Sequence, residues 1–70
     1  MRDIEIRDDM IRLGQLLKLA GLAEDGVHAK DLLEAQEVAV NGEQETRRGR
    51  QVHPGDVVSV GRDEIRVTTR

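Results

Sequence analysis

Two turn sequences inside the segment Val38–Val60 constrain the fold of this chain more than any other feature. Asn41-Gly42 is the pair best suited to a two-residue hairpin turn, because both residues tolerate a positive φ. Pro54-Gly55-Asp56 predicts a second turn, in which proline presets φ and glycine supplies a permissive backbone. Valine-rich runs border the two turns and predict strands over Val38–Val40 and Val57–Val60. The residues between the turns are therefore expected at the surface.

Two further strands are predicted near the ends of the chain. Ile4 and Ile6 alternate with charged residues, which is the pattern of a short, half-buried strand over residues 2–7. After a turn at residues 61–63, Glu64–Thr68 alternates in the same way. We expect this final strand to pair with Val57–Val60 and with the N-terminal strand, and so to close a small sheet.

A first helix is predicted after Asp8-Asp9, which offers an N-cap and favourable negative charge at a helix start. Apolar residues then follow at helical spacing: Met10, Leu13, Leu16, Leu17 and Ala20, with Ile11 beside them. Gly21 is expected to end this helix as a left-handed cap, with Leu22 folding back on the last turn.

A second helix is predicted from Asp25 or Gly26 to about Ala35-Gln36. Four of its residues are expected to point inward: Val27, Ala29, Leu32 and Leu33. Since the connector between the helices is short, the two must pack as a pair or cross at a steep angle. The sequence therefore predicts an α+β fold, a single domain over residues 1–70 in which two helices pack on a small, mostly antiparallel sheet.

Composition limits the class of protein. Apolar residues make up 37% of the chain and charged residues 36%, so the core is small. The absence of cysteine excludes disulfides and thiolate metal sites, and it fits a reducing cytoplasm. No apolar run approaches the roughly 18 residues of a membrane span, and Met1–Glu5 lacks the apolar region of a signal peptide. We therefore expect a small, monomeric cytoplasmic protein without membrane contact.

The chain also contains no Phe, Tyr or Trp, the rings on which proteins usually stack single-stranded bases. Any contact with nucleic acid is thus expected through phosphates, 2′-hydroxyls and shape. The net charge is −3, but residues 1–43 hold ten acids against five Lys or Arg, whereas residues 44–70 hold four acids against six Arg. Because the local potential decides where a phosphate binds, the C-terminal part can still carry a basic patch.

Three arginines lie between the two turns: Arg47, Arg48 and Arg50. Guanidinium groups match phosphate geometry bidentately, and Gly49 would allow the backbone to approach a ligand closely. This cluster is therefore the first candidate for an anion-binding site. The alternative is a solvated loop whose charge is balanced by Glu43 and Glu45.

Four other cationic or titratable residues are weaker candidates. Arg12 opens the first helix, although it could simply pair with Asp8 or Asp9. His28 and Lys30 lie in the first turns of the second helix, where free N–H groups and the helix dipole favour anions. The alternative for Lys30 is an exposed i,i+4 pair with Glu34. Lys18 has a similar status, with plain surface as its alternative.

The sequence does not carry the constellations that metal or catalytic sites need. His28 and His53 have no paired-ligand spacing, so no metal site is predicted. Ser59 lies in a predicted strand without a candidate base, and no Gly-rich loop of a phosphate-cradling type occurs. We therefore expect neither a cofactor nor an enzyme.

Four segments in order resemble the RNA-binding domain family named after ribosomal small-subunit protein four, the alpha-L RNA-binding motif. They are Arg12–Leu17, Ala29–Leu33, Val38–Gly42 and Pro54–Val58, and the resemblance covers about residues 10–60. Residues 13–19 and 41–48 look like the stand-alone, YbcJ-like members. The resemblance implies a helix pair on a small sheet that contacts structured RNA, often ribosomal, through the helices and the adjoining basic loop, without catalysis.

The sequence departs from the family pattern at three places. Many members have Asp where this chain has Gly14, Ser-Arg where it has Asp25-Gly26, and Gly where it has Gln36. The missing arginine at Gly26 removes one phosphate contact that the resemblance implies.

Two functions follow as expectations. The first is an RNA-binding module for structured RNA such as rRNA, acting in ribosome assembly or translation. Its RNA-binding surface is expected to consist of Arg12, His28, Lys30, Arg47, Arg48 and Arg50, with Lys18 as a further RNA-binding residue. The second is a protein-interaction adaptor, in which the acidic first half binds a basic partner such as a ribosomal or other RNA-binding protein.

Overall fold

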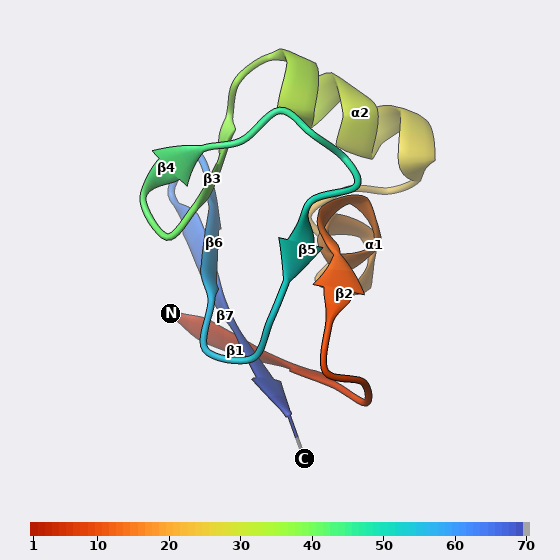
Figure 1. Cartoon of the computed structure of the whole chain (residues 1–70). Coiled ribbons are helices and arrows are strands. Elements are labelled where there is room, and N and C mark those ends of the chain that lie inside the picture. Colours follow the sequence, from red (N-terminus) through yellow and green to blue (C-terminus); the bar gives the residue numbers. More distant parts are fainter. Residues whose placement is uncertain (70) are drawn as a thin grey trace.

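The computed structural model describes residues 1–69, which form two helices and seven short strands (Figure 1). In chain order the elements are β1 (Arg2–Ile6), β2 (Ile11–Arg12), α1 (Leu13–Leu19), α2 (Gly26–Glu34), β3 (Val38–Val40), β4 (Glu43–Gln44), β5 (Gln51–Val52), β6 (Val57–Val60) and β7 (Asp63–Thr69). The helix pair lies to one side of the larger sheet (Figure 1). This arrangement confirms the predicted α+β class.

Five strands form the main sheet in the order β1-β7-β6-β3-β4. β7 is parallel to β1 and antiparallel to β6, and the other pairs are antiparallel, so the sheet is mostly antiparallel as predicted. The predicted pairing of the last strand with both its neighbours is thus confirmed. The two charged side chains of one β1–β7 register pair also meet, because Arg66 Nη2 lies 3.3 Å from Asp3 Oδ1.

The two predicted turns form and are bonded to each other. Asn41 and Gly42 have φ values of 52° and 83°, and they join β3 to β4 in a two-residue hairpin. The Asn41 side chain accepts a hydrogen bond from the Val57 N–H at 2.9 Å and donates one to Asp56 Oδ1 at 3.0 Å. Burial opposes ionisation of Asp56, but bonds from the His53 N–H and Asn41, together with the charge of His53, lower the pKa of Asp56 below its ordinary value.

The first helix begins later than predicted, and Asp8-Asp9 is not its cap. Ile11 and Arg12 are extended and pair with β5, so α1 begins at Leu13. The side chain of the N-cap residue Arg12 makes no capping bond. Instead, the first two N–H groups of α1 donate across the molecule to carbonyls of residues 50 and 48, at 2.8 and 3.0 Å. A helix start that is satisfied by another segment needs no acidic cap.

The end of α1 agrees with the prediction. Gly21 has a φ of 75°, and the N–H of Leu22 donates to the Leu17 carbonyl at 2.9 Å, which is the six-to-one bond of a Schellman motif. The Arg2 guanidinium donates to the carbonyl of Ala20, the C-cap residue. A cation at this end of a helix is also favoured by the helix dipole.

The second helix has the predicted start, where Asp25 accepts a hydrogen bond from the His28 N–H at 2.8 Å. Its end has the same Schellman bonds as α1, but the left-handed residue is Gln36, with a φ of 62°. Ala29 and Leu33 are buried as predicted. The inward position predicted for Val27 is wrong: this residue is 70% exposed, because it lies in the first turn of α2 on the side away from the core.

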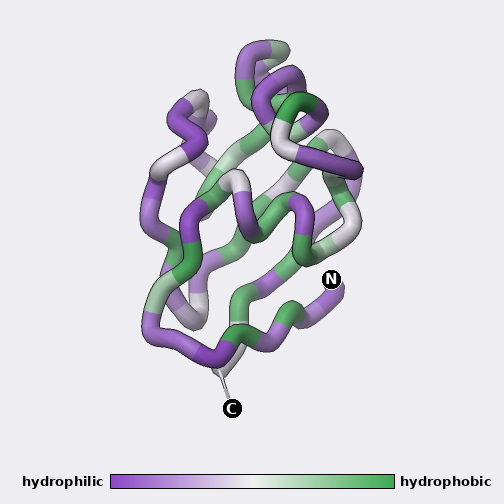
Figure 2. Tube along the Cα trace, turned by 90° about the vertical axis from the view of Figure 1, so that its right-hand side faces the viewer, coloured by the Kyte–Doolittle hydropathy of each residue, from purple (hydrophilic) through white to green (hydrophobic). Residues whose placement is uncertain are grey.

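The core joins residues from both helices and from both sheets. The largest fully buried side chains are Leu13, Leu16, Leu17, Leu33, Ile65, Val38, Val40, Val52, Val58 and Val67. In Figure 2 the hydrophobic stretches of the trace lie in the middle of the molecule, and hydrophilic stretches lie in the peripheral turns and loops. Within residues 1–69, neither helix is long and apolar enough to cross a membrane.

Candidate nucleic-acid interface

The segment Glu45–Arg50, here called the arginine loop, joins β4 of the main sheet to β5 of the small sheet (Figure 1). Its carbonyls at residues 48 and 50 receive the first N–H groups of α1, as described above. A third bond runs from Arg12 Nη1 to the Gly49 carbonyl at 2.9 Å. The arginine loop is therefore fastened along the N-terminal end of α1.

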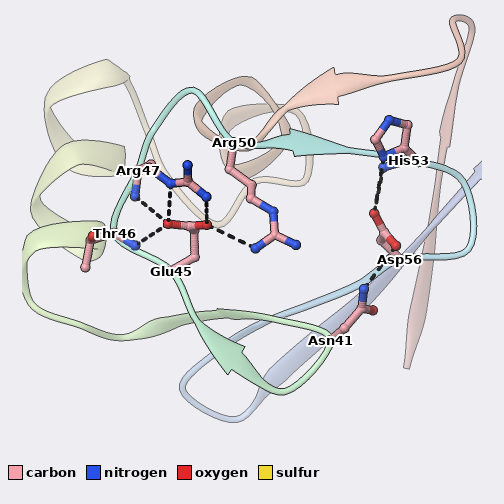
Figure 3. A network of polar contacts seen from close by, with 7 residues as sticks. All are labelled: Asn41, Glu45, Thr46, Arg47, Arg50, His53 and Asp56. Carbon is pink, nitrogen blue, oxygen red and sulfur yellow. Dashed lines mark hydrogen bonds and ion pairs between the residues drawn. The ribbon is translucent and has the colours of Figure 1, made fainter.

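Glu45 is a buried acid at the base of the arginine loop and is 6% exposed (Figure 3). Its Oε2 accepts hydrogen bonds from the N–H groups of Thr46 and Arg47, at 2.9 and 3.0 Å. The guanidinium of Arg47 reaches both carboxylate oxygens at 3.2 Å, and Arg50 Nη1 reaches Oε1 at 3.0 Å. One carboxylate therefore holds the turn of the loop and two of its three arginines.

These bonds lower the pKa of Glu45 to about 2 from an ordinary value of 4.5. The side-chain bond from Arg47 is the largest cause, followed by the Arg47 backbone N–H and the Arg50 side chain. Burial raises the pKa, but it is outweighed by these donors. Glu45 is therefore negatively charged at neutral pH. It balances part of the positive charge of the arginine loop, which was the alternative given for this loop.

Arg48 has a different environment. Its side chain lies against α1 at Gly14, so closely that a Cβ at residue 14 would be 2.4 Å from Arg48 Cγ. The helix can approach the loop this closely only because residue 14 has no side chain. Arg48 makes no ion pair with any other residue in the described range 1–69.

Arg48 lines a pocket of about 290 Å³ between α1, α2 and the arginine loop. We call this the Arg48 pocket. Its lining consists of Arg12, Gly14, Gln15, Lys18, Gly26, Ala29, Arg48 and Gly49. Three predicted site residues therefore surround one space: Arg12 and Lys18 from one part of the chain and Arg48 from the arginine loop.

A second depression adjoins this pocket. Its volume is about 430 Å³, and it is lined by Arg12, Arg47, Gly49, Arg50 and Gln51. Arg12 and Gly49 line both spaces, so the two are neighbours on the surface. The structure thus brings five of the seven predicted residues onto one surface, which we call the cationic surface: Arg12, Lys18, Arg47, Arg48 and Arg50.

The structure does not bring His28 and Lys30 into either space. His28 is part of the start of α2, where its Nδ1 accepts a hydrogen bond from the Glu24 N–H at 3.0 Å. Lys30 Nζ lies 3.8 Å from Glu34 Oε1, the i,i+4 pair that was the alternative for this residue. The side chains of both residues are therefore engaged in local contacts of α2.

His53 lies in the second turn, 3.8 Å from Asp56 through Nδ1 and Oδ2 (Figure 3). Across residues 1–69, no three His, Asp or Glu side chains are close enough together to hold a metal ion.

Sequence reasoning missed the importance of two residues. Glu45 was considered only as a balancing charge, and Gly14 only as a departure from a family pattern. A glutamate just before three arginines is a signal that could have identified Glu45. Gly14 could not be found in this way, because its role depends on Arg48, which is distant in the sequence and adjacent only in the fold.

Comparison with known proteins matches residues 4–68 to the family described as S4 domain. This chain belongs to the S4 domain family. The predicted family is thereby confirmed, and the match extends beyond the residues 10–60 that carried the resemblance.

A relative of this S4 domain is the "Probable ribosome maturation protein RlbA" of Bacillus subtilis (strain 168). The two are 49% identical over 57 residues, which cover 81% of this chain and 80% of the relative. Among solved structures, the 30S ribosomal protein S4e of Thermoplasma acidophilum is similar, with a TM-score of 0.65 over 86% of this chain. At 20% identity that likeness concerns the fold alone, and the S4 domain described here corresponds to 32% of the archaeal chain.

Proposed function

We propose that residues 1–70 form a non-catalytic, monomeric RNA-binding domain that recognises structured RNA through its phosphates and shape. The observation that carries the proposal is the convergence of Arg12, Lys18 and Arg48 on one pocket, continued by Arg47 and Arg50. These groups come from residues 12–18, at and in α1, and from a loop distant in sequence, so the fold itself concentrates positive charge on a chain with a net charge of −3. Phosphate groups supply the matching negative charge.

The kind of RNA is suggested by the relatives. A protein 49% identical to this one bears the name of a probable ribosome maturation protein, which supports rRNA as the ligand and ribosome assembly in the cytoplasm as the process. The absence of aromatic residues is consistent with binding to phosphates and shape rather than to a series of stacked bases.

The test is a titration of a short rRNA hairpin against the parent protein and matched variants. Arg48→Ala should weaken binding about tenfold, because Arg48 lines the pocket and forms no ion pair within residues 1–69. Arg62→Ala removes the same charge from a different depression, lined by Arg2 and Leu22 among others, and should change affinity less than about twofold. Equal losses for the two variants would contradict a localised site.

Lys30→Ala and His28→Ala extend this test to the two predicted residues that lie outside the cationic surface. Each should have an effect close to that of Arg62→Ala, since Lys30 pairs with Glu34 and His28 bonds to the backbone of Glu24. A loss as large as that of Arg48→Ala would mean that the RNA also contacts the outer face of α2.

A second candidate function is favoured by one observation. Leu19 is 57% exposed and lines a depression of about 450 Å³ together with Met10 and Ile11. Two acids and one arginine also line it: Glu5, Asp8 and Arg7. An apolar patch with acidic neighbours suits a basic protein segment. If the chain is an adaptor, its partners should survive nuclease treatment in a pull-down and be lost with Leu19→Lys, which places a positive charge in the patch. Partners released by nuclease would favour RNA binding instead.

A further inference from the structure

The Arg48 pocket has features that a purely phosphate-binding surface would not need. Its volume is about 290 Å³. That is roughly ten times the share of one water molecule in the liquid, about 30 Å³. It is also close to the lower end of the range of pockets that hold small organic ligands, about 300–1,000 Å³. A small organic group therefore fits the volume of this space.

The lining of the Arg48 pocket combines positively charged side chains with residues that have a very small side chain or none. Arg12, Lys18 and Arg48 supply the charge, whereas Gly14, Gly26 and Ala29 contribute little or no side chain. Among the described residues 1–69, no acidic side chain lines the pocket. An occupant should therefore carry negative charge and have a body that fits between small residues.

The pocket is formed before a ligand arrives. On one side, the arginine loop is held on α1 by three hydrogen bonds of 2.8–3.0 Å, from the N–H groups of Leu13 and Gly14 and from Arg12 Nη1. On the other side, the start of α2 is held by the Asp25 cap and by His28. A preorganised site loses less entropy on binding, so its shape can contribute to selectivity.

A nucleotide has the chemistry that this lining calls for. Its phosphate can be bound by Lys18, which acts as a point charge, and by the forked donors of Arg12 or Arg48. Its base can lie against a guanidinium plane, which stacks on aromatic rings and so replaces the aromatic side chains that this chain lacks. In a continuous duplex the bases are stacked inside the helix, so only an unpaired nucleotide from a bulge or loop could enter.

We propose that the Arg48 pocket holds one unpaired nucleotide of a structured RNA, with its own and the neighbouring phosphates at Arg12, Lys18 and Arg48 and its base or ribose beside Gly26, the half-buried glycine of the lining. The inference rests on the RNA-binding function proposed above and adds which feature of the RNA is selected. The rest of the cationic surface, at Arg47 and Arg50, then contacts the flanking duplex backbone.

The experiment uses two RNAs, a blunt duplex and the same duplex with one unpaired nucleotide at its centre. The parent protein should bind the bulged RNA about tenfold more tightly, a difference of about 1.4 kcal/mol, because only this RNA can place a base in the pocket. Gly26→Leu should abolish this preference, so that the variant binds the two RNAs with equal affinity. A Cβ at Gly26 meets no atom within 4 Å, so the leucine can fill the pocket without a backbone clash and without a change in charge.

Two controls match this variant. Gly26→Ala has the same effect on backbone freedom with much less added volume, and it should keep most of the preference. Val27→Leu adds bulk at the neighbouring residue, which is 70% exposed and does not line the pocket, and it should behave as the parent. Amide spectra of the parent give a second readout: the shift changes specific to the bulged RNA should lie at residues 14, 26 and 29.

The possible outcomes distinguish the nucleotide pocket from the RNA-binding function. Equal affinity of the parent for both RNAs would overturn the nucleotide pocket but leave the RNA-binding function standing. A preference that survives Gly26→Leu, or shift changes elsewhere, would place the unpaired nucleotide outside this pocket and also overturn the inference. Failure of the parent to bind either RNA would overturn the proposed function and the pocket together.

Discussion

Glu45 shows how one side chain can organise a cationic surface. The carboxylate is almost fully buried and accepts bonds from two backbone N–H groups and two guanidinium groups. Its negative charge reduces the attraction of nearby phosphates, yet its bonds decide where Arg47 and Arg50 point. Glu45 therefore lowers the net positive charge of the cationic surface and at the same time fixes the positions of two of its arginines.

The lowered pKa of Glu45 predicts a specific pH dependence of stability. A carboxylate with a pKa of about 2 in the folded protein and 4.5 in the unfolded chain stabilises the fold above pH 4.5. This stabilisation is lost as the pH falls from about 4.5 towards 2. We expect Glu45→Gln to lower the free energy of unfolding by about 1–3 kcal/mol at pH 7, and the difference from the parent to shrink over that window. Urea unfolding of both proteins from pH 2 to 7 measures this difference in the free energy of unfolding. A difference that does not change with pH would contradict the role of the ionised carboxylate.

The same variant separates geometry from net charge in RNA binding. Glu45→Gln changes the net charge from −3 to −2, so electrostatics alone predicts tighter binding of RNA. If Glu45 positions Arg47 and Arg50, the affinity should instead fall, by about three- to tenfold at constant salt. Fluorescence anisotropy with an rRNA hairpin measures whether the affinity rises or falls. Glu43→Gln is the control, because it removes an equal charge from the exposed strand β4. Tighter binding by Glu45→Gln would show that the loop does not need its carboxylate.

Gly14 is expected to respond unusually to alanine. In most helices Gly→Ala stabilises by up to about 1 kcal/mol. At this position the new Cβ would lie 2.4 Å from Arg48 Cγ, so Arg48 must move. We expect Gly14→Ala to destabilise by about 1–2 kcal/mol, and we expect Gly14→Ala in an Arg48→Ala background to stabilise. A double-mutant cycle by urea unfolding measures this coupling; additive effects would rule out the contact.

At the scale of elements, the clearest mismatch between local preference and structure is the end of α2. Gln36 occupies the left-handed position of a Schellman motif, where a Cβ is costly. We expect Gln36→Gly to stabilise by about 0.5–1 kcal/mol, since relief of this strain exceeds the added entropy of glycine in the unfolded chain. Gln36→Ala should be near neutral, because alanine retains the Cβ. Thermal unfolding compares the stability of the two variants with that of the parent. Destabilisation by glycine would mean that the Gln36 side chain itself stabilises the fold.

The start of α1 shows the limit of local signals at this scale. Asp8-Asp9 has the composition of an N-cap, yet the cap residue is Arg12 and the helix N–H groups are satisfied by the arginine loop. The pairing of β2 with β5 is a contact between residues about forty positions apart. By contrast, the Asn41-Gly42 hairpin, the Gly21 cap and the start of α2 at Gly26 depend on neighbouring residues, and all three were correctly predicted.

At the scale of the whole molecule, the acidic net charge and the cationic surface together predict a marked salt dependence. If each of the five cations meets one phosphate, the logarithm of the association constant should fall with the logarithm of salt concentration at a slope of about −3.5 to −4.5. Arg48→Ala should reduce the magnitude of this slope by about one. Titrations from 50 to 300 mM KCl measure the slope, whereas a slope near zero would exclude phosphate contacts as the source of affinity.

The amino-acid sequence alone determined the class of fold, because turns, caps and apolar periodicity act over a few residues and could be recognised one by one. The sequence also identified the cationic residues that are candidates for binding an anion. Only the tertiary structure decided which of them share a surface: the arginine loop is bonded to the first turn of α1, so Arg12, Lys18 and Arg48 meet, while His28 and Lys30 are engaged within α2. The burial of Glu45 and the contact of Gly14 with Arg48 likewise depend on residues that the chain brings together only on folding.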